Sequence, residues 1–469
     1  MSFLTKDEEP IVALCSPVGA GALAIIRLSG NGVVEIVDKI SKLQNNKLLS
    51  NQKTHTIHFG KIFDHTSNSI IDDVLFFLMK APKTFTGQDC IEISCHNNPF
   101  IIKKIIELCI SNGARAAENG EFSKRAFLNG KIDLIQAESI NELIAAQNEV
   151  VLKKSLEQLK GSLSSFIKEI EEEITKLLAL VEASFEFLDE EQRDVQFDQI
   201  IKNQFDLIFK KLEKIKENYS HSLQIKEGLR ISLLGSVNVG KSTLFNALIK
   251  KERSIVTDVA GTTRDSVEAG VCKDGNFWTF IDTAGLRKTE NLIEQQGIER
   301  SLQEACSADI LLLIISAVDK LSQEQIESYK EALEKYREKI ILVLNKIDLQ
   351  QNSAKQIISI LNVNIDPIKV SAITNAGIKE LENKIQEKIN IIFKQFNSPY
   401  LLNKRHFETL TNIENKLKET FVNIFEKYEG YEIAAMNLKD ILETLSQLTG
   451  KNINEQTLDS VFKNFCIGK

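Results

Sequence analysis

The sequence contains the run Gly235-Ser-Val-Asn-Val-Gly-Lys-Ser-Thr243, which follows an apolar stretch at residues 231–234 and precedes a helix-like stretch at residues 244–249. A strand, a glycine-rich turn and the start of a helix, in this order, form a loop whose backbone N–H groups converge on phosphate oxygens. In such a loop Lys241 reaches the outer phosphates of a nucleotide, and Ser242 offers its hydroxyl to Mg²⁺. The run therefore predicts a phosphate-binding loop within an α/β domain.

Two further segments supply the groups that such a loop needs around the terminal phosphate. An apolar strand is predicted from residue 277 and ends in Asp282-Thr-Ala-Gly285. Its carboxylate would complete the Mg²⁺ site, and the Gly285 N–H would approach a γ-phosphate. The polar loop Val256-Thr-Asp-Val-Ala-Gly-Thr-Thr-Arg-Asp265 lies between the two motifs. Within it, Thr263 is predicted to close on Mg²⁺ only when the γ-phosphate is present.

The identity of the base follows from a third strand, predicted over residues 340–345, which runs into Asn345-Lys-Ile-Asp348. A carboxylate such as that of Asp348 accepts hydrogen bonds from N1–H and the 2-amino group of guanine, and adenine presents neither donor. Lys346 would lay its aliphatic stem along the ring. The motifs together predict a guanine nucleotide site. Its predicted residues are Asn238, Val239, Gly240, Lys241, Ser242, Thr243, Thr257, Asp258, Val259, Ala260, Gly261, Thr262, Thr263, Asp282, Thr283, Ala284, Gly285, Asn345, Lys346, Asp348, Ser371 and Ala372.

One position separates this site from a Ras-like switch. The residue after Gly285 is Leu286, whereas Ras-type enzymes keep a glutamine there that orients the attacking water. A leucine side chain has no hydrogen-bonding group, so another polar residue must hold the water. Glu290, Glu294 and Glu299 follow within the next turns of chain, and chemistry alone does not choose among them.

Composition and charge exclude several classes of protein. At 469 residues the chain is expected to hold about three domains. A net charge of −7 gives no overall attraction to nucleic acid, so contact with RNA would need a local basic patch or a partner that supplies one. The acidic N-terminus lacks an apolar core, and no window approaches the roughly 20 apolar residues that span a bilayer. A cytoplasmic protein without membrane contact is therefore predicted.

Cysteine and histidine spacing argues against a structural metal. The seven cysteines show no paired C-x-x-C spacing, and the six histidines show no ligand spacing either. Neither a zinc site nor a disulfide framework is therefore expected. Most of the cysteines are predicted to be small buried side chains, with Cys466 near the C-terminus as the exception.

Residues 1–130 are predicted to form an α+β domain. Its predicted strands cover residues 11–15, 22–28, 55–59, 74–79 and 91–95, and its predicted helices cover residues 32–43 and 99–111. The run Gly19-Ala-Gly-Ala-Leu-Ala24 fits a dinucleotide fingerprint, but that fingerprint must open a helix. The continuation here reads as a strand. The run is therefore interpreted as a loop that closes over a ligand or a neighbouring protomer.

The remaining chain is predicted to be a helical bundle with a nucleotide domain inserted in it. An apolar stripe steps by threes and fours from Leu159 to Val181, about 33 Å long in a helix, and a second runs from Phe197 to Ile215. Neither flanking segment buries its stripe alone, so the two are expected to pack together. The predicted parts are a helical domain at residues 131–226 and 394–469 and a P-loop GTPase domain at residues 227–393.

The sequence resembles the tRNA-modifying GTPases called MnmE or TrmE over essentially its whole length. Beyond the nucleotide motifs, the resemblance depends on Gly297-Ile-Glu-Arg300, Gly120-Glu-Phe-Ser-Lys-Arg-Ala-Phe-Leu-Asn129 and the terminal Phe465-Cys-Ile-Gly-Lys469. The last two runs occur in few other contexts and are more diagnostic than the GTPase motifs.

The resemblance implies an activity, cofactors and partners. Members of this family act with a flavin- and NADH-using partner, MnmG, to attach an aminomethyl or carboxymethylaminomethyl group at C5 of the wobble uridine of certain tRNAs. The resemblance further implies a homodimer through the N-terminal domain and a heterotetramer with MnmG. It also implies a site for a reduced folate, 5-formyl- or methylene-tetrahydrofolate, and K⁺-dependent pairing of the nucleotide domains that triggers hydrolysis.

The resemblance also assigns roles to individual residues. Glu294 falls at the family's water-orienting position, which would resolve the question raised by Leu286, and it joins Lys241 as a catalytic residue. Ser242 and Thr263 would bind Mg²⁺. The K⁺ ligands would be Asn238 and backbone groups of Thr257, Val259 and Thr262. The folate ligands would be Arg27, Glu92, Lys131 and Lys469.

Two departures from the family pattern lie near the implied folate site. His96-Asn-Asn-Pro99 stands where the family has His-Gly-Gly-Pro, and Ala117-Glu-Asn-Gly120 replaces an Arg-Pro-Gly run. Loss of two glycines is expected to reshape a loop that needs positive φ. Two alternatives therefore stay open. One is a family member that hydrolyses GTP without binding folate, and the other is a regulatory or ribosome-assembly GTPase whose flanking domains are only binding modules.

Overall fold

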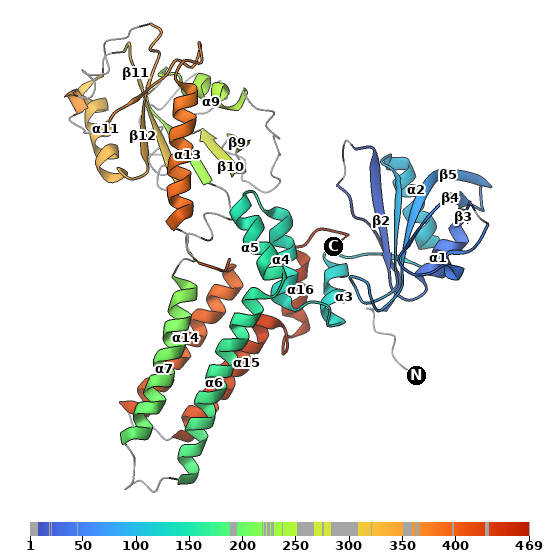
Figure 1. The fold of residues 1–469 in the computed structure, drawn as a ribbon. Helices are drawn as coiled ribbons and strands as arrows, with labels where there is room; N and C mark the ends of the chain where they lie inside the picture. The colour runs from blue at the N-terminus through green and yellow to red at the C-terminus, as the bar shows by residue number, and fades with distance from the viewer. Residues whose placement is uncertain are drawn as a thin grey trace. The chain divides into compact units, whose positions relative to one another are not determined.

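The structure, a computed structural model, describes residues 8–17, 19, 21–44, 46–187, 195–217, 219, 222, 226, 229–236, 238–250, 267–273, 276–282, 308–319, 321–349, 359–361, 365–395, 398–426 and 431–468 (Figure 1). The chain divides into two compact units. One comprises Met1–Ile144, Ser155–Leu212 and Glu408–Lys469, and the other comprises Ala145–Lys154 and Glu213–Phe407. The predicted multidomain architecture, with an α+β part, a helical part and an α/β part, is confirmed.

The first unit contains a seven-stranded sheet with the strand order β3-β4-β5-β6-β2-β1-β7. Neighbouring strands are antiparallel except β1 and β7, which are parallel. This sheet confirms the strands predicted for the N-terminal part. The strands are β1 (Ile11–Leu14), β2 (Leu23–Ser29), β3 (Ser41–Leu43), β4 (Thr56–Asp64), β5 (Ser69–Met79), β6 (Cys90–His96) and β7 (Arg115–Ala116).

Helices α1 (Val33–Ile40) and α2 (Pro99–Ser111) bury their apolar sides against one face of this sheet, and a short 3₁₀ helix, η1 (Leu49–Asn51), joins the same core. The expected helix over residues 32–43 is wrong at its end. Ser41 takes an extended conformation, with φ −121° and ψ 152°, and pairs opposite Ile62 of β4. Pairing with a neighbouring strand gives these backbone groups hydrogen bonds that one more helical turn would otherwise provide.

The helical segments on either side of the nucleotide domain pack together, as predicted. Helix α6 packs along α15 (Figure 1), and Phe205 of α7 meets the ring edge of Phe421 of α14 at 5.3 Å between centroids. At the other end, Leu134 of α4 shares a core with Phe462 of α16. The helices are α3 (Glu121–Leu128), α4 (Leu134–Ala145), α5 (Glu149–Leu159), α6 (Ser162–Phe187), α7 (Val195–Lys216), α14 (Lys404–Phe425), α15 (Tyr431–Thr449) and α16 (Glu455–Lys463).

The two predicted apolar stripes need one correction each. The first is not continuous, because α5 ends at Leu159 and α6 begins at Ser162, with Gly161 between them at φ +94°. A residue in the left-handed region ends a helix, so the stripe belongs to two helices. In the second stripe, Ile200 is 50% exposed while Ile201 and Phe205 are buried.

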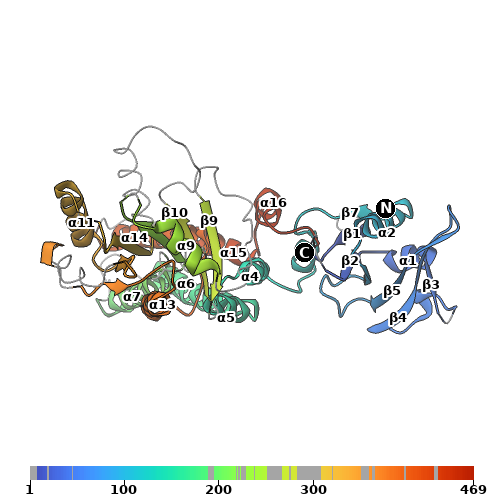
Figure 2. The same ribbon diagram turned by 90° about the horizontal axis from the view of Figure 1, so that it is seen from above.

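The second unit contains a six-stranded sheet with the order β13-β12-β11-β8-β10-β9, in which only β9 is antiparallel to its neighbour. Helices α9 (Lys241–Lys250) and α13 (Ile378–Gln395) cover one face, and α11 (Gln323–Lys335) covers the other (Figure 2). Every residue of β11 is buried, as a strand covered on both faces requires. The strands are β8 (Leu229–Leu234), β9 (Val267–Lys273), β10 (Asn276–Asp282), β11 (Ile310–Ser316), β12 (Ile340–Asn345) and β13 (Ile368–Lys369).

Two further predictions, on membrane-spanning helices and on the burial of cysteines, can be compared with the described residues. Helices within the ranges given above include none that combines the length and the hydropathy needed to cross a membrane. Of the cysteines in those ranges, Cys90, Cys95 and Cys109 are buried and Cys466 is exposed. Burial raises the pKa of the Cys109 thiol to about 12, which keeps that thiol unreactive at neutral pH.

Candidate functional site

The phosphate loop follows β8 and leads directly into α9. Asn238 and Gly240 both take positive φ, +66° and +93°. A Cβ at Gly235 would lie 2.5 Å from the carbonyl oxygen of Ile314, and one at Gly240 would collide with the side-chain amide of Asn345. Both glycines of the motif are therefore required by close packing against neighbouring strands, and this packing brings the loop to the carboxyl ends of β8, β11 and β12.

Lys241 is the first residue of α9 and is only 9% exposed. Its Nζ donates to the carbonyl oxygens of Gly235 at 2.8 Å and Ser236 at 2.9 Å. The ammonium group is thus held over the loop at the positive end of the α9 dipole, where an anion is stabilised. Ser242 follows in the first turn of α9 and is half-buried, and its Mg²⁺ role stays a prediction.

Asn345 connects the phosphate loop to the Ser371–Ala372 turn, whose two residues belong to the predicted guanine nucleotide site. The residue ends β12 and is 2% exposed. Its Nδ2 donates to the carbonyl oxygen of Val239 at 2.9 Å, and the Ala372 N–H donates to its Oδ1 at 3.2 Å. One buried amide side chain therefore fixes the phosphate end of the site relative to the base end.

The charged side chains of Lys346 and Asp348, which follow Asn345, are partly or fully exposed to solvent. Lys346 takes φ +64°, and its Nζ lies 3.3 Å from Oδ2 of Asp319. Hydrogen bonding from Ser316, together with Lys346, holds the pKa of Asp319 below its ordinary value. Asp348 is exposed. Asp319 was not predicted, since a single aspartate after a buried strand carries no motif.

Tyr329 is a second residue that the sequence did not mark. It belongs to α11 and its hydroxyl accepts the Ser236 N–H at 2.8 Å. Helical periodicity predicts only that a tyrosine at this position is buried, and the contact joins positions 93 residues apart.

Several predicted residues lie outside the described residues. Among the GTP and ion ligands they are Thr257, Asp258, Val259, Ala260, Gly261, Thr262, Thr263, Thr283, Ala284 and Gly285, and the water-orienting candidate Glu294 and the folate candidate Lys469 join them. Asp282 is described at the backbone, where it ends β10 and pairs with Leu233 of β8.

Two of the folate candidates face each other on neighbouring strands of the N-terminal sheet. Arg27 of β2 pairs in register with Glu92 of β6. The Nε and Nη2 atoms of Arg27 lie 2.8 Å and 2.7 Å from Glu92 Oε1, and the two side chains are 23% and 21% exposed. Lys131 makes a different contact, with its Nζ donating to the carbonyl oxygen of Pro82 at 2.5 Å.

The C-terminal segment packs onto the same part of the N-terminal sheet. The carbonyl oxygen of Gly468 accepts from Arg27 Nη1 at 3.3 Å and from the Cys15 thiol at 3.1 Å. Gly468 takes φ +90°, and a Cβ there would lie 2.5 Å from the carbonyl oxygen of Leu14. Gly468 therefore lies next to the Arg27–Glu92 pair, and Cys466, two residues earlier, is exposed. No sequence motif indicated that Cys15 takes part in this contact.

The expected effect of the two asparagines on the local backbone does not hold. Asn98 takes φ −118° and caps α2, with its side chain accepting the Phe100 N–H at 2.9 Å. Asn97 donates from Nδ2 to the carbonyl oxygen of Gly19 at 2.8 Å. The segment therefore has no need of a left-handed residue at position 98, and asparagine at an N-cap position is favourable.

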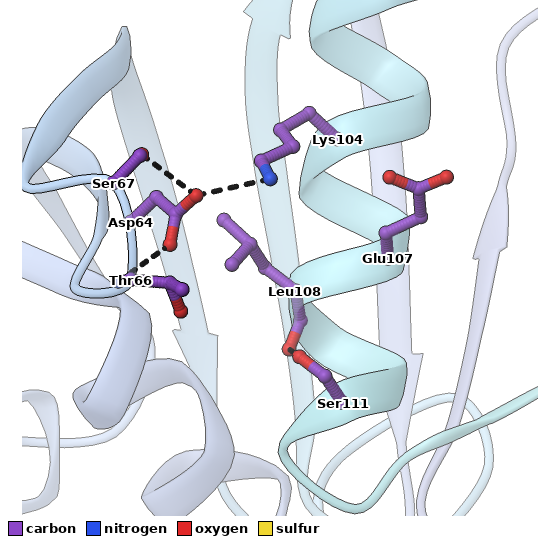
Figure 3. Close-up of a pocket in the computed structure, with 7 residues that line it drawn as sticks. All are labelled: Asp64, Thr66, Ser67, Lys104, Glu107, Leu108 and Ser111. Carbon is purple, nitrogen blue, oxygen red and sulfur yellow. Dashed lines mark hydrogen bonds and ion pairs between the residues drawn. The ribbon is translucent and has the colours of Figure 1, made fainter.

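A hollow of about 380 Å³ lies between the β4–β5 turn and α2 (Figure 3). None of the predicted site residues lines it. Asp64 at its edge accepts from the Thr66 N–H and the Ser67 hydroxyl and pairs with Lys104 at 3.0 Å. Lys104 is the main reason that the pKa of Asp64 is lowered. Because the carboxylate is already satisfied, its role here is to fasten the turn to the helix.

Comparison with known proteins finds two family models on this chain. "GTP-binding protein TrmE N-terminus" matches residues 10–131, and "MnmE helical domain" matches residues 134–466. Among curated relatives, the tRNA modification GTPase MnmE of Aquifex aeolicus is 38% identical over 98% of this chain and 100% of its own length. The protein of the same name from Clostridioides difficile is 36% identical, over 98% of this chain and 99% of its own. That of Bacillus subtilis is 34% identical, over 98% and 100%.

Proposed function

This chain belongs to the MnmE family of tRNA modification GTPases, and from that premise we propose that it hydrolyses GTP to drive modification at C5 of the wobble uridine of certain tRNAs. The observation that carries the nucleotide site is the buried Asn345 side chain, which joins the phosphate loop to the Ser371–Ala372 turn. We assign the N-terminal folate and dimerisation domain to residues 1–130, the helical domain to residues 131–226 and 394–469, and the GTPase domain to residues 227–393.

The nucleotide chemistry follows from the groups around the loop. Lys241 binds the outer phosphates, and Asp348 accepts the guanine donors. Mg²⁺, held by Ser242 and Thr263, supplies positive charge to the phosphate oxygens. Asn238, with backbone groups of Thr257, Val259 and Thr262, holds K⁺ in the position where other GTPases use an arginine. Glu294 orients the attacking water, a role that Leu286 has no group to fill.

The uridine chemistry requires groups outside the nucleotide domain. Arg27, Glu92, Lys131 and Lys469 bind a reduced folate as the one-carbon source, and the flavoprotein MnmG completes the reaction in a heterotetramer. The ion pair between Arg27 and Glu92 supports the folate proposal, because it places a charged donor and acceptor beside the C-terminal segment. This arrangement favours a modification enzyme over a GTPase with purely binding flanks.

Homodimer formation through the N-terminal domain has a candidate surface. The sheet face opposite α1 and α2 exposes large apolar side chains on adjacent strands. Ile57 faces Phe77, and Phe59 faces Leu75 across β4 and β5. Contiguous apolar surface of this kind marks an interaction site. On the same face, β2 also exposes apolar side chains, and β6 between β5 and β2 presents Ser94 and Glu92 there. Its exposed members are Leu23, Ile25, Ile57, Phe59 and Leu75.

The proposed K⁺ dependence is tested by GTP turnover in K⁺ and in Na⁺ buffer, with Asn238→Ala and Asn345→Ala variants. We expect K⁺ to raise the rate at least tenfold, a threshold set below the roughly 10³- to 10⁵-fold acceleration that an arginine supplies in other GTPases. Asn238→Ala should abolish the K⁺ effect, whereas Asn345→Ala should weaken GTP binding in both salts. Equal rates in K⁺ and Na⁺ would remove the cation from the mechanism.

The modification itself is tested in a strain that lacks the gene. Wild-type protein should restore the modified wobble uridine in bulk tRNA, measured by nucleoside mass spectrometry, and Arg27→Ala should not. Restoration by Arg27→Ala at the wild-type level would exclude Arg27 as a folate ligand that the modification requires. If wild-type protein restored nothing, the two alternatives, a GTPase without folate binding and a regulatory GTPase, would become the better descriptions.

A further inference from the structure

Tyr329 brings a buried hydroxyl from α11 to the start of the phosphate loop. The residue is 6% exposed and packs in the core between α11 and the sheet. Its hydroxyl accepts the N–H of Ser236 at 2.8 Å. Helix α11 is itself fixed at its beginning, where Ser322 and Gln325 form a reciprocal capping box. The hydroxyl is therefore presented to the loop from a rigid element.

The contact falls on the same peptide group that restrains Lys241. The Ser236 N–H and the Gly235 carbonyl belong to one peptide plane. The carbonyl accepts from Lys241 Nζ at 2.8 Å, while the N–H donates to Tyr329. Hydrogen bonds linked in this way polarise one another, so an acceptor on the N–H strengthens the carbonyl as an acceptor for the ammonium.

Gly235 makes this restraint necessary. A glycine leaves the orientation of the following peptide plane less restricted than any other residue would. A side chain cannot replace it, because a Cβ would lie 2.5 Å from the carbonyl oxygen of Ile314. The loop thus needs a glycine for packing and an external group to fix the plane that the glycine leaves free.

We propose that Tyr329 is a positioning residue for Lys241. Its hydroxyl fixes the Gly235–Ser236 peptide, which in turn holds the ammonium where the outer phosphates of GTP bind. The inference rests on the proposed role of Lys241 as a phosphate ligand. The proposal predicts that loss of the Tyr329 hydroxyl weakens binding of the outer phosphates alone. The α-phosphate and the base are bound by other groups of the site.

The test is Tyr329→Phe, which removes only the hydroxyl. Tyr336→Phe is the matched control, since Tyr336 is the C-cap of the same helix and lies in the same core. Affinities for GTP and for GMP are measured by displacement of a fluorescent guanine nucleotide, and melting temperatures are recorded for each protein. Tyr329→Phe should weaken GTP binding about tenfold, which corresponds to losing about one hydrogen bond's worth of positioning for Lys241. It should leave GMP binding unchanged, and Tyr336→Phe should alter neither.

Each other outcome decides against the proposal. Unchanged GTP binding, or equal losses for GTP and GMP, would show that Tyr329 acts only in packing. Lys241→Ala is measured in parallel to separate this inference from its premise. A large loss of GTP affinity in Lys241→Ala with none in Tyr329→Phe would overturn the positioning role alone. Wild-type GTP affinity in Lys241→Ala would overturn the assignment of Lys241 and the positioning role with it.

Discussion

The proposed base selection in the nucleotide site depends on one exposed carboxylate. Asp348 lies beyond the strand end fixed by Asn345, and guanine needs an acceptor for two N–H donors. Asp348→Asn replaces one acceptor oxygen with an NH₂ group that faces the 2-amino group of guanine but suits the 2-oxo group of xanthine. We expect the variant to lose GTP affinity by about 100-fold, because its NH₂ group and the 2-amino group of guanine are both donors and neither finds an acceptor. We expect it to gain affinity for xanthosine triphosphate, whose 2-oxo group accepts from the NH₂ group.

Competition binding with both nucleotides measures the change. Asp366→Asn is the control, since it removes an equally exposed carboxylate that belongs to none of the nucleotide motifs. Retention of GTP preference by Asp348→Asn would exclude Asp348 as the base-reading group.

A buried ion-pair cluster fastens α3 to the N-terminal sheet. Glu121 accepts from Arg115 and from Arg125, and Arg125 is fully buried. Burial alone would raise the pKa of Glu121, but hydrogen bonds from Arg115, the Glu118 N–H and Arg125 outweigh it and lower the pKa. A carboxylate whose pKa is lowered on folding stabilises the fold above its ordinary pKa of about 4.3, and loses this contribution as the pH falls through the folded value.

Glu121→Gln should therefore destabilise the protein at pH 7 by about 3 kcal/mol, the scale for breaking a buried pair. The difference from wild type should shrink as the pH falls below about 4. Urea unfolding followed between pH 7 and pH 3 measures it, with the exposed Glu118 changed to Gln as the control. A destabilisation that stayed constant over this range would assign the effect to packing, independent of the charge.

At the scale of elements, the periodicity of the sequence predicted most of what was found. The apolar run at residues 310–315 in β11 and the placement of α2 after Asn98 follow from local patterns. The misplaced end of the helix at Ile40 and the break at Gly161 do not. In both places, contacts with segments that are distant in the sequence select one of two local conformations. The periodicity of the local sequence does not contain that information.

At the scale of the whole molecule, the proposed homodimer requires the open face of the N-terminal sheet. Phe59 is 48% exposed on that face, and Phe100 is 82% exposed at the start of α2. Phe59→Asp should place a charge in a buried apolar interface and convert the dimer into a monomer, because burying an unpaired charge is costly. Phe100→Asp should leave the dimer intact.

Sedimentation or light scattering of the full-length chain over a concentration series distinguishes these outcomes. A Phe59→Asp dimer as stable as the wild type would exclude this face as the interface.

The sequence by itself determined which residues are proposed for the nucleotide site, because the loop glycines, Lys241, Asn345 and Asp348 lie within short motifs of characteristic spacing. Only the tertiary structure decided which groups from distant parts of the chain contact these residues, and which groups contact the folate candidate Arg27. Tyr329 reaches Ser236, Asp319 reaches Lys346, and the Gly468 carbonyl is held by Arg27 and Cys15. The physical reason is that such contacts depend on how strands and helices are ordered in space, and a hydrogen bond between remote residues leaves no periodic trace in either segment.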